Sequence, residues 1–168
     1  MENRKVLIVD DDPAYLDSLQ QTLESDGIIV FTSRNPVHAL HTFEMEKPQI
    51  VICDLNLCAA MDGLTVCGRA KAMVPKTVTI AMACCLTAYD LSYCLGSGMF
   101  NDAITKPFDP TLLLIVANLW FIKRKRWDLA DGTTYKTGED RKQTIKDLSE
   151  LLESFKTYEG DELTTSRV

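Results

Sequence analysis

Aspartates follow two apolar runs of the chain, and their placement indicates a cation-dependent chemistry. The run at 5–10 ends in Asp10, with Asp11 and Asp12 directly behind it, and the run at 49–54 ends in Asp54. Two unit charges about 4 Å apart repel by roughly 4 kcal/mol at an effective dielectric constant near 20. Converging carboxylates therefore need a cation, a proton or separation. Mg²⁺ suits such a site because it binds one or two carboxylates together with phosphate oxygens.

The elements that would position these aspartates alternate between strand and helix. Apolar runs predict strands at 5–10, 28–32, 49–54, 77–84 and 102–105. An Asp or Asn before Pro predicts the helices that start at 13 and 36, and further helices are predicted at 63–73, 88–95 and 110–126. Strands with so few polar residues indicate a parallel sheet covered on both faces. We expect a doubly wound α/β fold with five parallel strands in the order 2-1-3-4-5.

This strand order brings the aspartates together. The first and third strands become neighbours, and ligands of open α/β sheets bind beyond the carboxyl ends of the strands, where the order reverses. Asp10 and Asp11 would then face Asp54 across one crevice. Asp12 would turn away to cap the helix that follows. A divalent cation in the crevice would relieve the repulsion among the remaining carboxylates.

Length, composition and charge limit the class of protein. The chain has 168 residues, of which 46% are hydrophobic and 25% charged, and its formal net charge is −6. This length fits one domain at 1–127, a polar linker at 128–139, an amphipathic C-terminal helix at 140–158 and a disordered tail at 159–168. The charge does not favour nucleic-acid binding, and no stretch approaches the roughly 20 apolar residues of a membrane span. Six cysteines without paired CxxC spacing fit a reducing, cytoplasmic environment.

Three stretches together resemble the receiver domain of two-component response regulators. They are the acidic pair at 10–11, the segment "DLNLCAAMDGLTVC" that starts at Asp54, and the segment "DAITKPF" that contains Lys106 and Pro107. The resemblance covers residues 4–126. It implies the flavodoxin-like fold expected above and a part in phosphorelay signal transduction.

The resemblance also implies a role for each residue of the site. Asp54 would accept a phosphoryl group from a sensor histidine kinase or a histidine phosphotransfer protein, in a reaction that needs Mg²⁺ or Mn²⁺. Asp11, Asp54 and the backbone carbonyl of Asn56 would hold the ion directly, and Asp10 would do so through a water. Lys106 would pair with Asp54 at rest and with a phosphoryl oxygen afterwards. The chain would be a phosphoacceptor switch that assists its own phosphorylation and dephosphorylation, rather than an enzyme.

Some positions depart from the family pattern. We assign the switch hydroxyl expected after the fourth strand to Thr87 in "CCLTAYD", with Cys84 or Ala83 as alternatives for that place. The loop after Asp54 is longer than usual. The switch aromatic of the family, three positions before the lysine, is replaced by Ala103.

The C-terminal part of the sequence indicates how the protein would pass its signal to a partner. The helix predicted at 110–126 is apolar almost all round, so it needs a second partner. The helix at 140–158 carries a narrow apolar stripe of Ile145, Leu148, Leu152 and Phe155. Either helix could form a homodimer, and for the helix at 140–158 we rank packing onto the receiver first, pairing with a second chain next and docking to a target last. Because forty residues are too few for a DNA-binding module, we expect a stand-alone receiver that signals to a downstream protein by contact.

Two other functions compete with this interpretation. A phosphatase similar to the haloacid dehalogenase superfamily would use Asp10 as nucleophile and Asp12 as acid, because that family spaces these groups two residues apart after its first strand. A degenerate receiver would bind partners without accepting phosphate. The intact set of Asp10, Asp11, Asp54 and Lys106 argues against the degenerate form, and the altered loops argue for it.

Overall fold

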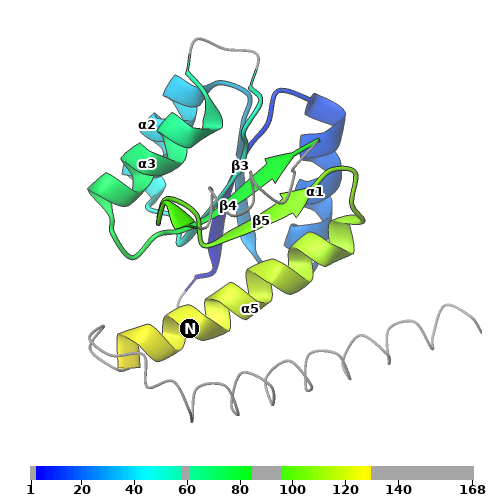
Figure 1. The fold of residues 1–168 in the computed structure, drawn as a ribbon. Coiled ribbons are helices and arrows are strands. Elements are labelled where there is room, and N and C mark those ends of the chain that lie inside the picture. The colour runs from blue at the N-terminus through cyan, green and yellow to red at the C-terminus, as the bar shows by residue number, and fades with distance from the viewer. Residues whose placement is uncertain (1–2, 58–60, 85–95, 130–168) are drawn as a thin grey trace, which may run out of the picture. The chain divides into compact units, whose positions relative to one another are not determined.

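Strands and helices alternate along the chain (Figure 1), and the computed structural model describes residues 3–57, 61–84 and 96–129. The first range contains β1 (Lys5–Val9), α1 (Pro13–Ser25), β2 (Ile29–Ser33), α2 (Pro36–Glu46) and β3 (Ile50–Asp54). The others contain α3 (Gly63–Met73), β4 (Val78–Ala83), β5 (Asp102–Thr105) and α5 (Pro110–Leu129). The five predicted strands are all present, with small shifts at their ends.

Several expectations fall outside the described residues. These are the helix predicted at 88–95, the candidate switch residue Thr87, and the parts of the predicted linker, C-terminal helix and tail beyond residue 129. The linker was expected to begin at 128, whereas α5 continues to Leu129.

The five strands form one parallel sheet in the order β2-β1-β3-β4-β5, which confirms the predicted topology. β1 lies between β2 and β3, with Val9 opposite Ser33 on one side and opposite Cys53 on the other. β3 in turn pairs with β4, where Asp54 lies opposite Met82. The last residues of β1 and β3 are therefore side by side at the carboxyl end of the sheet.

Helices cover the sheet on both faces, with α1 on one side and the pair α2 and α3 on the other (Figure 1). The inner strands β1, β3 and β4 are buried on both faces, as expected for a parallel sheet, whereas the edge strands β2 and β5 are partly exposed. α1 buries an apolar stripe of Leu16, Leu19 and Leu23. The core on the side of α2 and α3 includes Phe43, Val66 and Phe100. Burial of these side chains is what fixes the helices to the sheet.

Local capping interactions set where the helices begin. The side chain of Asp12 accepts hydrogen bonds from the amides of Ala14 and Tyr15, at 2.9 and 3.3 Å, and Pro13 occupies the first turn. Asn35 caps α2 in the same way, and Asp62 caps α3 by accepting from the amide of Thr65 at 2.8 Å. The predicted N-caps at Asp12 and Asn35 are confirmed. These caps fix the geometry of the loops that leave β1 and β2.

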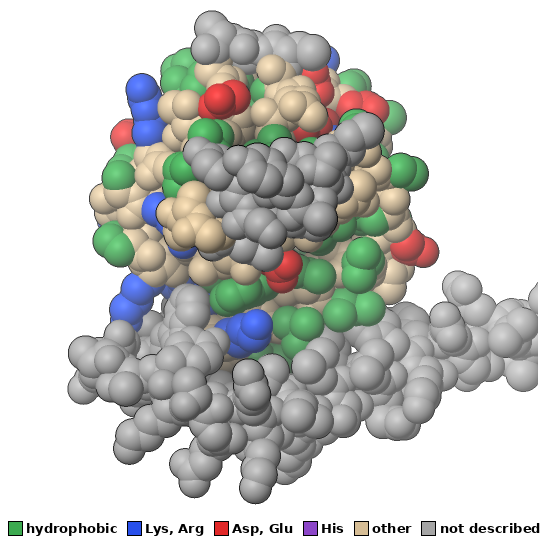
Figure 2. All heavy atoms as spheres, viewed as in Figure 1, with side chains coloured by type: hydrophobic (Ala, Val, Ile, Leu, Met, Phe, Trp, Pro, Cys, Tyr) green, Lys and Arg blue, Asp and Glu red, His purple; other side chains and the backbone are tan. Residues whose placement is uncertain are grey.

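The chain divides into two compact units, residues 1–114 and 115–168. The sheet, α1, α2, α3 and the start of α5 belong to the first unit, and the described part of the second is the continuation of α5. No described helix is long and apolar enough to cross a membrane. On the face shown in Figure 2, the described Lys and Arg side chains lie at separate places rather than in one basic patch.

Candidate phosphoacceptor site

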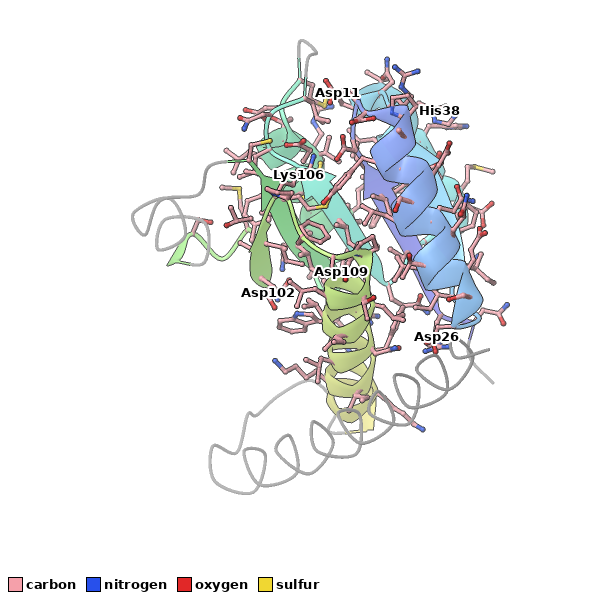
Figure 3. The ribbon with its side chains drawn as sticks, turned by 90° about the vertical axis from the view of Figure 1, so that its right-hand side faces the viewer. Asp11, Asp26, His38, Asp102, Lys106 and Asp109 are labelled. Atoms are coloured by element: carbon pink, nitrogen blue, oxygen red, sulfur yellow. The ribbon has the colours of Figure 1, made fainter. Side chains whose placement is uncertain are left out.

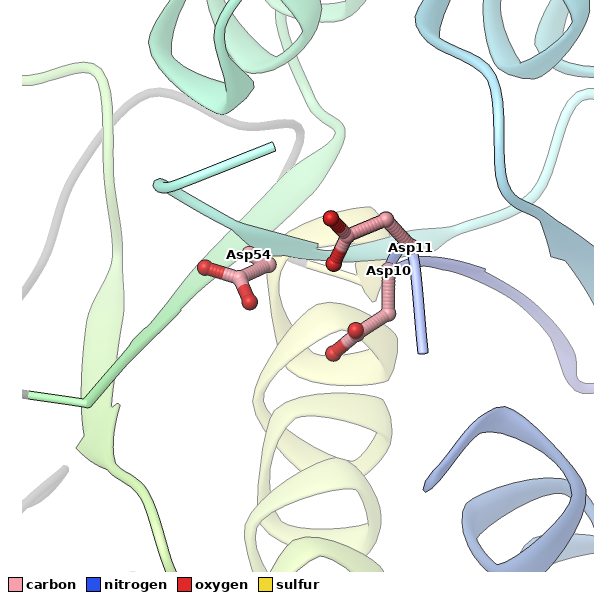
Figure 4. A group of neighbouring side chains, drawn as sticks. All are labelled: Asp10, Asp11 and Asp54. Atoms are coloured by element: carbon pink, nitrogen blue, oxygen red, sulfur yellow. The ribbon is translucent and has the colours of Figure 1, made fainter. Parts of the chain in front are cut away.

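Three carboxylates converge beyond the ends of β1 and β3. Asp10 and Asp11 follow β1, Asp54 ends β3, and each offers an oxygen within 4.8 Å of the others. Asp10 and Asp54 are buried, with 1% and 4% of their surface exposed, and Asp11 is half-buried. In Figure 4 the side chains of Asp10 and Asp11 point toward that of Asp54. The convergence predicted from the strand order is therefore present.

The ammonium of Lys106 is a cation within this cluster, and it comes from the end of a third strand, β5. Lys106 follows β5 directly, and its amide donates to the carbonyl of Ala83 at 2.8 Å. Its ammonium donates to Asp10 Oδ2 at 2.5 Å and also to Asp54 Oδ2. Only 11% of the Lys106 side chain is exposed. In Figure 3 Asp11 and Lys106 lie at one end of the sheet, and Asp26 lies at the opposite end.

The backbone orients the two buried carboxylates. Asp10 Oδ1 accepts a hydrogen bond from the amide of Asp12 at 3.0 Å, and Asp54 Oδ1 accepts one from the amide of Asn56 at 2.8 Å. In each carboxylate one oxygen is thus held by the loop that follows the strand, and the other faces Lys106. These hydrogen bonds fix the orientation of the Asp54 carboxylate at the carboxyl end of β3.

Burial and the neighbouring charges shift the pKa values of Asp10 and Lys106. Burial raises the pKa of Asp10, and the hydrogen bond from Lys106 offsets only part of this effect. Burial alone would lower the pKa of Lys106, but hydrogen bonds and charge attraction from Asp10 and Asp54 outweigh it, so that this pKa is raised. Lys106 therefore stays a cation at neutral pH.

The donor set fits a hard divalent cation. Asp10, Asp11 and Asp54 supply only oxygen ligands, and this cluster of three carboxylates contains one ammonium, which pairs with Asp10 and Asp54. Mg²⁺ prefers carboxylate oxygens and keeps part of its water shell, which the half-buried position of Asp11 allows. The ligand role expected for the Asn56 carbonyl stays a prediction.

Asp12 lies apart from this chemistry. Its carboxylate caps α1, and the residue is exposed, so it has the role predicted for a cap rather than that of an acid beside Asp10. This position argues against the phosphatase hypothesis, which needs Asp10 and Asp12 to act together.

Two aromatic residues at the site were not found by sequence reasoning. The ring of Tyr15 in α1 lies 4.7 Å from the ammonium of Lys106, and Phe108 meets this ring edge to face at 5.7 Å between centroids. Tyr15 is four residues after Asp11, one position before the buried stripe of α1 begins. An aromatic side chain one turn after the acidic pair is the signal that could have indicated it.

The switch position remains a prediction at Thr87, but the structure locates the alternatives. Ala83 is the last residue of β4 and is buried, and Cys84 follows it directly and is exposed. Burial is the main cause that raises the pKa of Tyr15, whose ring lies over Lys106. Ala103 is half-buried against the core on the side of α2 and α3.

The neighbouring cysteines are structural. Cys53 precedes Asp54 and Cys67 lies on α3, and both are fully buried. A hydrogen bond between the two thiols, together with burial, raises the pKa of Cys53 well above its ordinary value. The thiol of Cys53 therefore stays protonated, and both cysteines act as small core residues.

α3 approaches the acceptor strand closely. A Cβ atom on Gly63, the first residue of α3, would lie 2.0 Å from the backbone oxygen of Asp54 and 3.0 Å from the sulfur of Cys53. Only glycine permits this approach. The contact fixes the start of α3 against the end of β3.

Comparisons with known proteins agree with this geometry. The family model of the response regulator receiver domain matches residues 6–118. An uncharacterized 14.6 kDa protein of Leptolyngbya boryana is 41% identical over 113 residues, which cover 65% of this chain and 83% of that protein. The alkaline phosphatase synthesis transcriptional regulatory protein PhoP of Bacillus subtilis is 32% identical over 163 residues, 93% of this chain and 64% of that protein. The chain thus spans less than two thirds of the length of this regulator.

A solved structure supports the fold. The receiver domain protein of Methanospirillum hungatei JF-1, described as CheY-like, superposes with a TM-score of 0.68 at 26% identity, over 74% of this chain and 98% of that one. Together with the match of the family model, the sheet order and the converging carboxylates, this shows that the chain belongs to the response regulator receiver domain family.

Proposed function

We propose that Asp54 accepts a phosphoryl group from a phosphohistidine of a sensor histidine kinase or a histidine phosphotransfer protein. The observation that carries the proposal is the ammonium of Lys106 held between Asp10 and Asp54, with Asp11 alongside. An oxygen of Asp54 would attack phosphorus while the bond from phosphorus to the imidazole nitrogen breaks, which leaves an aspartyl phosphate and a free histidine. Phosphoryl transfer depends mainly on positioning and charge stabilisation.

The residues of this chain supply that positioning. The amide of Asn56 orients the acceptor carboxylate, and Lys106 is placed to neutralise charge on a phosphoryl oxygen. Asp10, Asp11 and Asp54 would hold Mg²⁺, or Mn²⁺ in its place, with the Asn56 carbonyl as a further ligand. The bound ion would supply charge neutralisation at the transferring group. We infer that the same groups assist hydrolysis of the aspartyl phosphate.

The output of the switch is also proposed. Phosphorylation replaces the single charge of the Asp54 carboxylate with an acyl phosphate of about two negative charges, and this net gain of charge together with three strong acceptor oxygens can reorder nearby loops. We propose that the phosphorylated chain acts on a downstream protein by contact, in the cytoplasm. Self-association through α5 or through residues 140–158 stays a prediction.

Phosphorylation by acetyl phosphate tests the acceptor. We expect wild-type protein with Mg²⁺ to gain the mass of one phosphoryl group, and to lose this gain when the metal is chelated. Asp54→Asn should abolish the gain, and Asp17→Asn, which changes an exposed aspartate of α1, should leave it unchanged. Equal labelling of wild type and Asp54→Asn would contradict the proposal. Absence of labelling in wild type would favour a degenerate receiver that only binds partners.

A further inference from the structure

The ammonium of Lys106 has a third neighbour besides its two carboxylates. The ring of Tyr15 lies 4.7 Å from Nζ, within the range of a cation–π interaction. Asp10 and Asp54 occupy two sides of the ammonium, and this ring covers another. The three contacts come from three separate elements of the fold, namely α1 and the ends of β1 and β3.

The ring itself is held in place. Phe108, two residues after Lys106, meets Tyr15 with an angle of 75° between the ring planes, which is a favourable edge-to-face geometry. α1 is fixed by the cap at Asp12 and by its buried stripe. Tyr15 therefore presents a preformed surface to the flexible four-carbon side chain of Lys106, in addition to the two carboxylates that bind its ammonium.

We propose that Tyr15 is a positioning residue, whose ring holds the ammonium of Lys106 toward Asp54, where it meets the incoming phosphoryl group. This inference rests on the proposed function of Asp54 and Lys106. The ring is expected to act through Lys106 and not on phosphorus directly. Its removal should slow phosphoryl transfer without weakening the initial binding of the phosphodonor.

Removal of the Tyr15 hydroxyl distinguishes a role of the ring in positioning Lys106 from a direct role of the hydroxyl in the reaction. It is buried and makes no hydrogen bond of good geometry with the described residues, although the backbone of Phe108 lies near it. A buried polar group without a partner does not stabilise the fold. Tyr15→Phe should therefore keep the ring over Lys106 and retain the wild-type rate.

A double-mutant cycle with acetyl phosphate as the probe tests the proposal. Tyr15→Leu should lower the maximal rate of phosphorylation by about 5- to 30-fold, the range expected for loss of a cation–π interaction at a largely desolvated cation. The acetyl phosphate concentration at half-maximal rate should not change. In a Lys106→Met background, Tyr15→Leu should cause no further loss, because the group on which it acts is gone.

Matched controls exclude a general effect of losing a ring. Phe31 lies 5.7 Å from the ammonium of Lys5 at the other end of β1, so Phe31→Leu removes a comparable ring remote from the site and should leave the rate unchanged. A wild-type rate in Tyr15→Leu, or the same loss with and without Lys106, would overturn the proposal. Circular dichroism on each variant verifies that it is folded.

A spectroscopic measurement keeps this inference separate from the acceptor chemistry. The ring of Tyr15 should shift the NMR signals of the Lys106 Cε protons upfield, and this shift should survive in Tyr15→Phe and disappear in Tyr15→Leu. If wild-type protein showed the shift but no phosphorylation, the proposed function would fail while the contact remained. If phosphorylation were normal and the shift absent, the role of Tyr15 would be wrong.

Discussion

The ammonium of Lys106, directly after β5, donates a hydrogen bond to the carboxylate of Asp54, which ends β3. These residues are 52 positions apart in the sequence, and β4 lies between their strands. The same ammonium also donates a hydrogen bond to Asp10, which follows β1, the strand next to β3. The ammonium of Lys106 thus offsets part of the repulsion among the carboxylates at the ends of the two strands. The repulsion that remains favours binding of a divalent cation.

Mg²⁺ should stabilise the folded chain through these carboxylates. An ion that binds only the folded state at 100 times its dissociation constant adds about 2.7 kcal/mol to the free energy of unfolding. Thermal unfolding followed with increasing MgCl₂ should show a rising midpoint for wild type. Asp11→Asn should remove most of this rise, and Asp17→Asn should keep it. An identical response of all three proteins would show that the ion binds elsewhere.

Removal of Lys106 should make stability depend differently on pH. Lys106→Met leaves buried Asp10 without its cation, so we expect the free energy of unfolding in metal-free buffer to fall by about 2 kcal/mol at neutral pH. The folded pKa of Lys106 is raised above 10.5, so its stabilising effect is present below that value and is lost as pH rises through the folded pKa. The difference between the two proteins should therefore shrink at high pH.

Asp10 adds a second pH dependence of the same sign at low pH. Its pKa is raised above 3.8, so the folded state binds this proton more tightly, and stability falls as pH rises through the interval between the unfolded and folded pKa. Lys106→Met should thus recover stability as Asp10 is protonated. Urea denaturation across the pH range measures both effects, and a constant difference between the proteins would contradict this account.

The close approach of α3 to β3 makes Gly63 intolerant of a side chain. In Gly63→Ala the new Cβ would meet the backbone oxygen of Asp54, so we expect a loss of about 1–3 kcal/mol in stability and slower phosphorylation. Gly68→Ala on the same helix is the control, because its Cβ would lie 3.6 Å from the sulfur of Met99, an ordinary contact. Urea denaturation should show Gly68→Ala equal to wild type or more stable.

Asp12 should matter for stability and not for chemistry. Asp12→Ala removes the N-cap of α1 and should cost about 1 kcal/mol, whereas Asp12→Ser retains a capping oxygen and should cost less. Both variants should still be phosphorylated by acetyl phosphate in the presence of Mg²⁺. A phosphatase that used Asp12 as its acid would instead lose turnover in both.

The sequence predicted those parts of the fold that depend on local pattern. Asp12 with Pro13 marked the start of α1 because an acceptor side chain before proline is a strong capping signal. The apolar runs marked the five strands, and the parallel order then placed Asp10 beside Asp54 without any knowledge of distances. The site could be anticipated because strand ends in such a sheet share one edge.

Contacts between distant residues were beyond such reasoning. Tyr15 contacts Lys106 because α1 packs against the sheet. The position of a tyrosine beside an apolar stripe does not predict which cation its ring will contact. Gly63 looked like an ordinary helix start, and its close approach to Asp54 appears only in three dimensions. The apolar run continues past Ala83, so the sequence left Ala83 and Cys84 as alternatives to Thr87 for the switch position.

The central claim is that the carboxylate of Asp54 is the group that becomes phosphorylated. Borohydride reduction of the phosphorylated protein converts an aspartyl phosphate into homoserine, which peptide mass spectrometry can locate. This account predicts homoserine at position 54 in wild type, dependent on Mg²⁺ during phosphorylation. Homoserine at position 10 would contradict it and would support the phosphatase hypothesis.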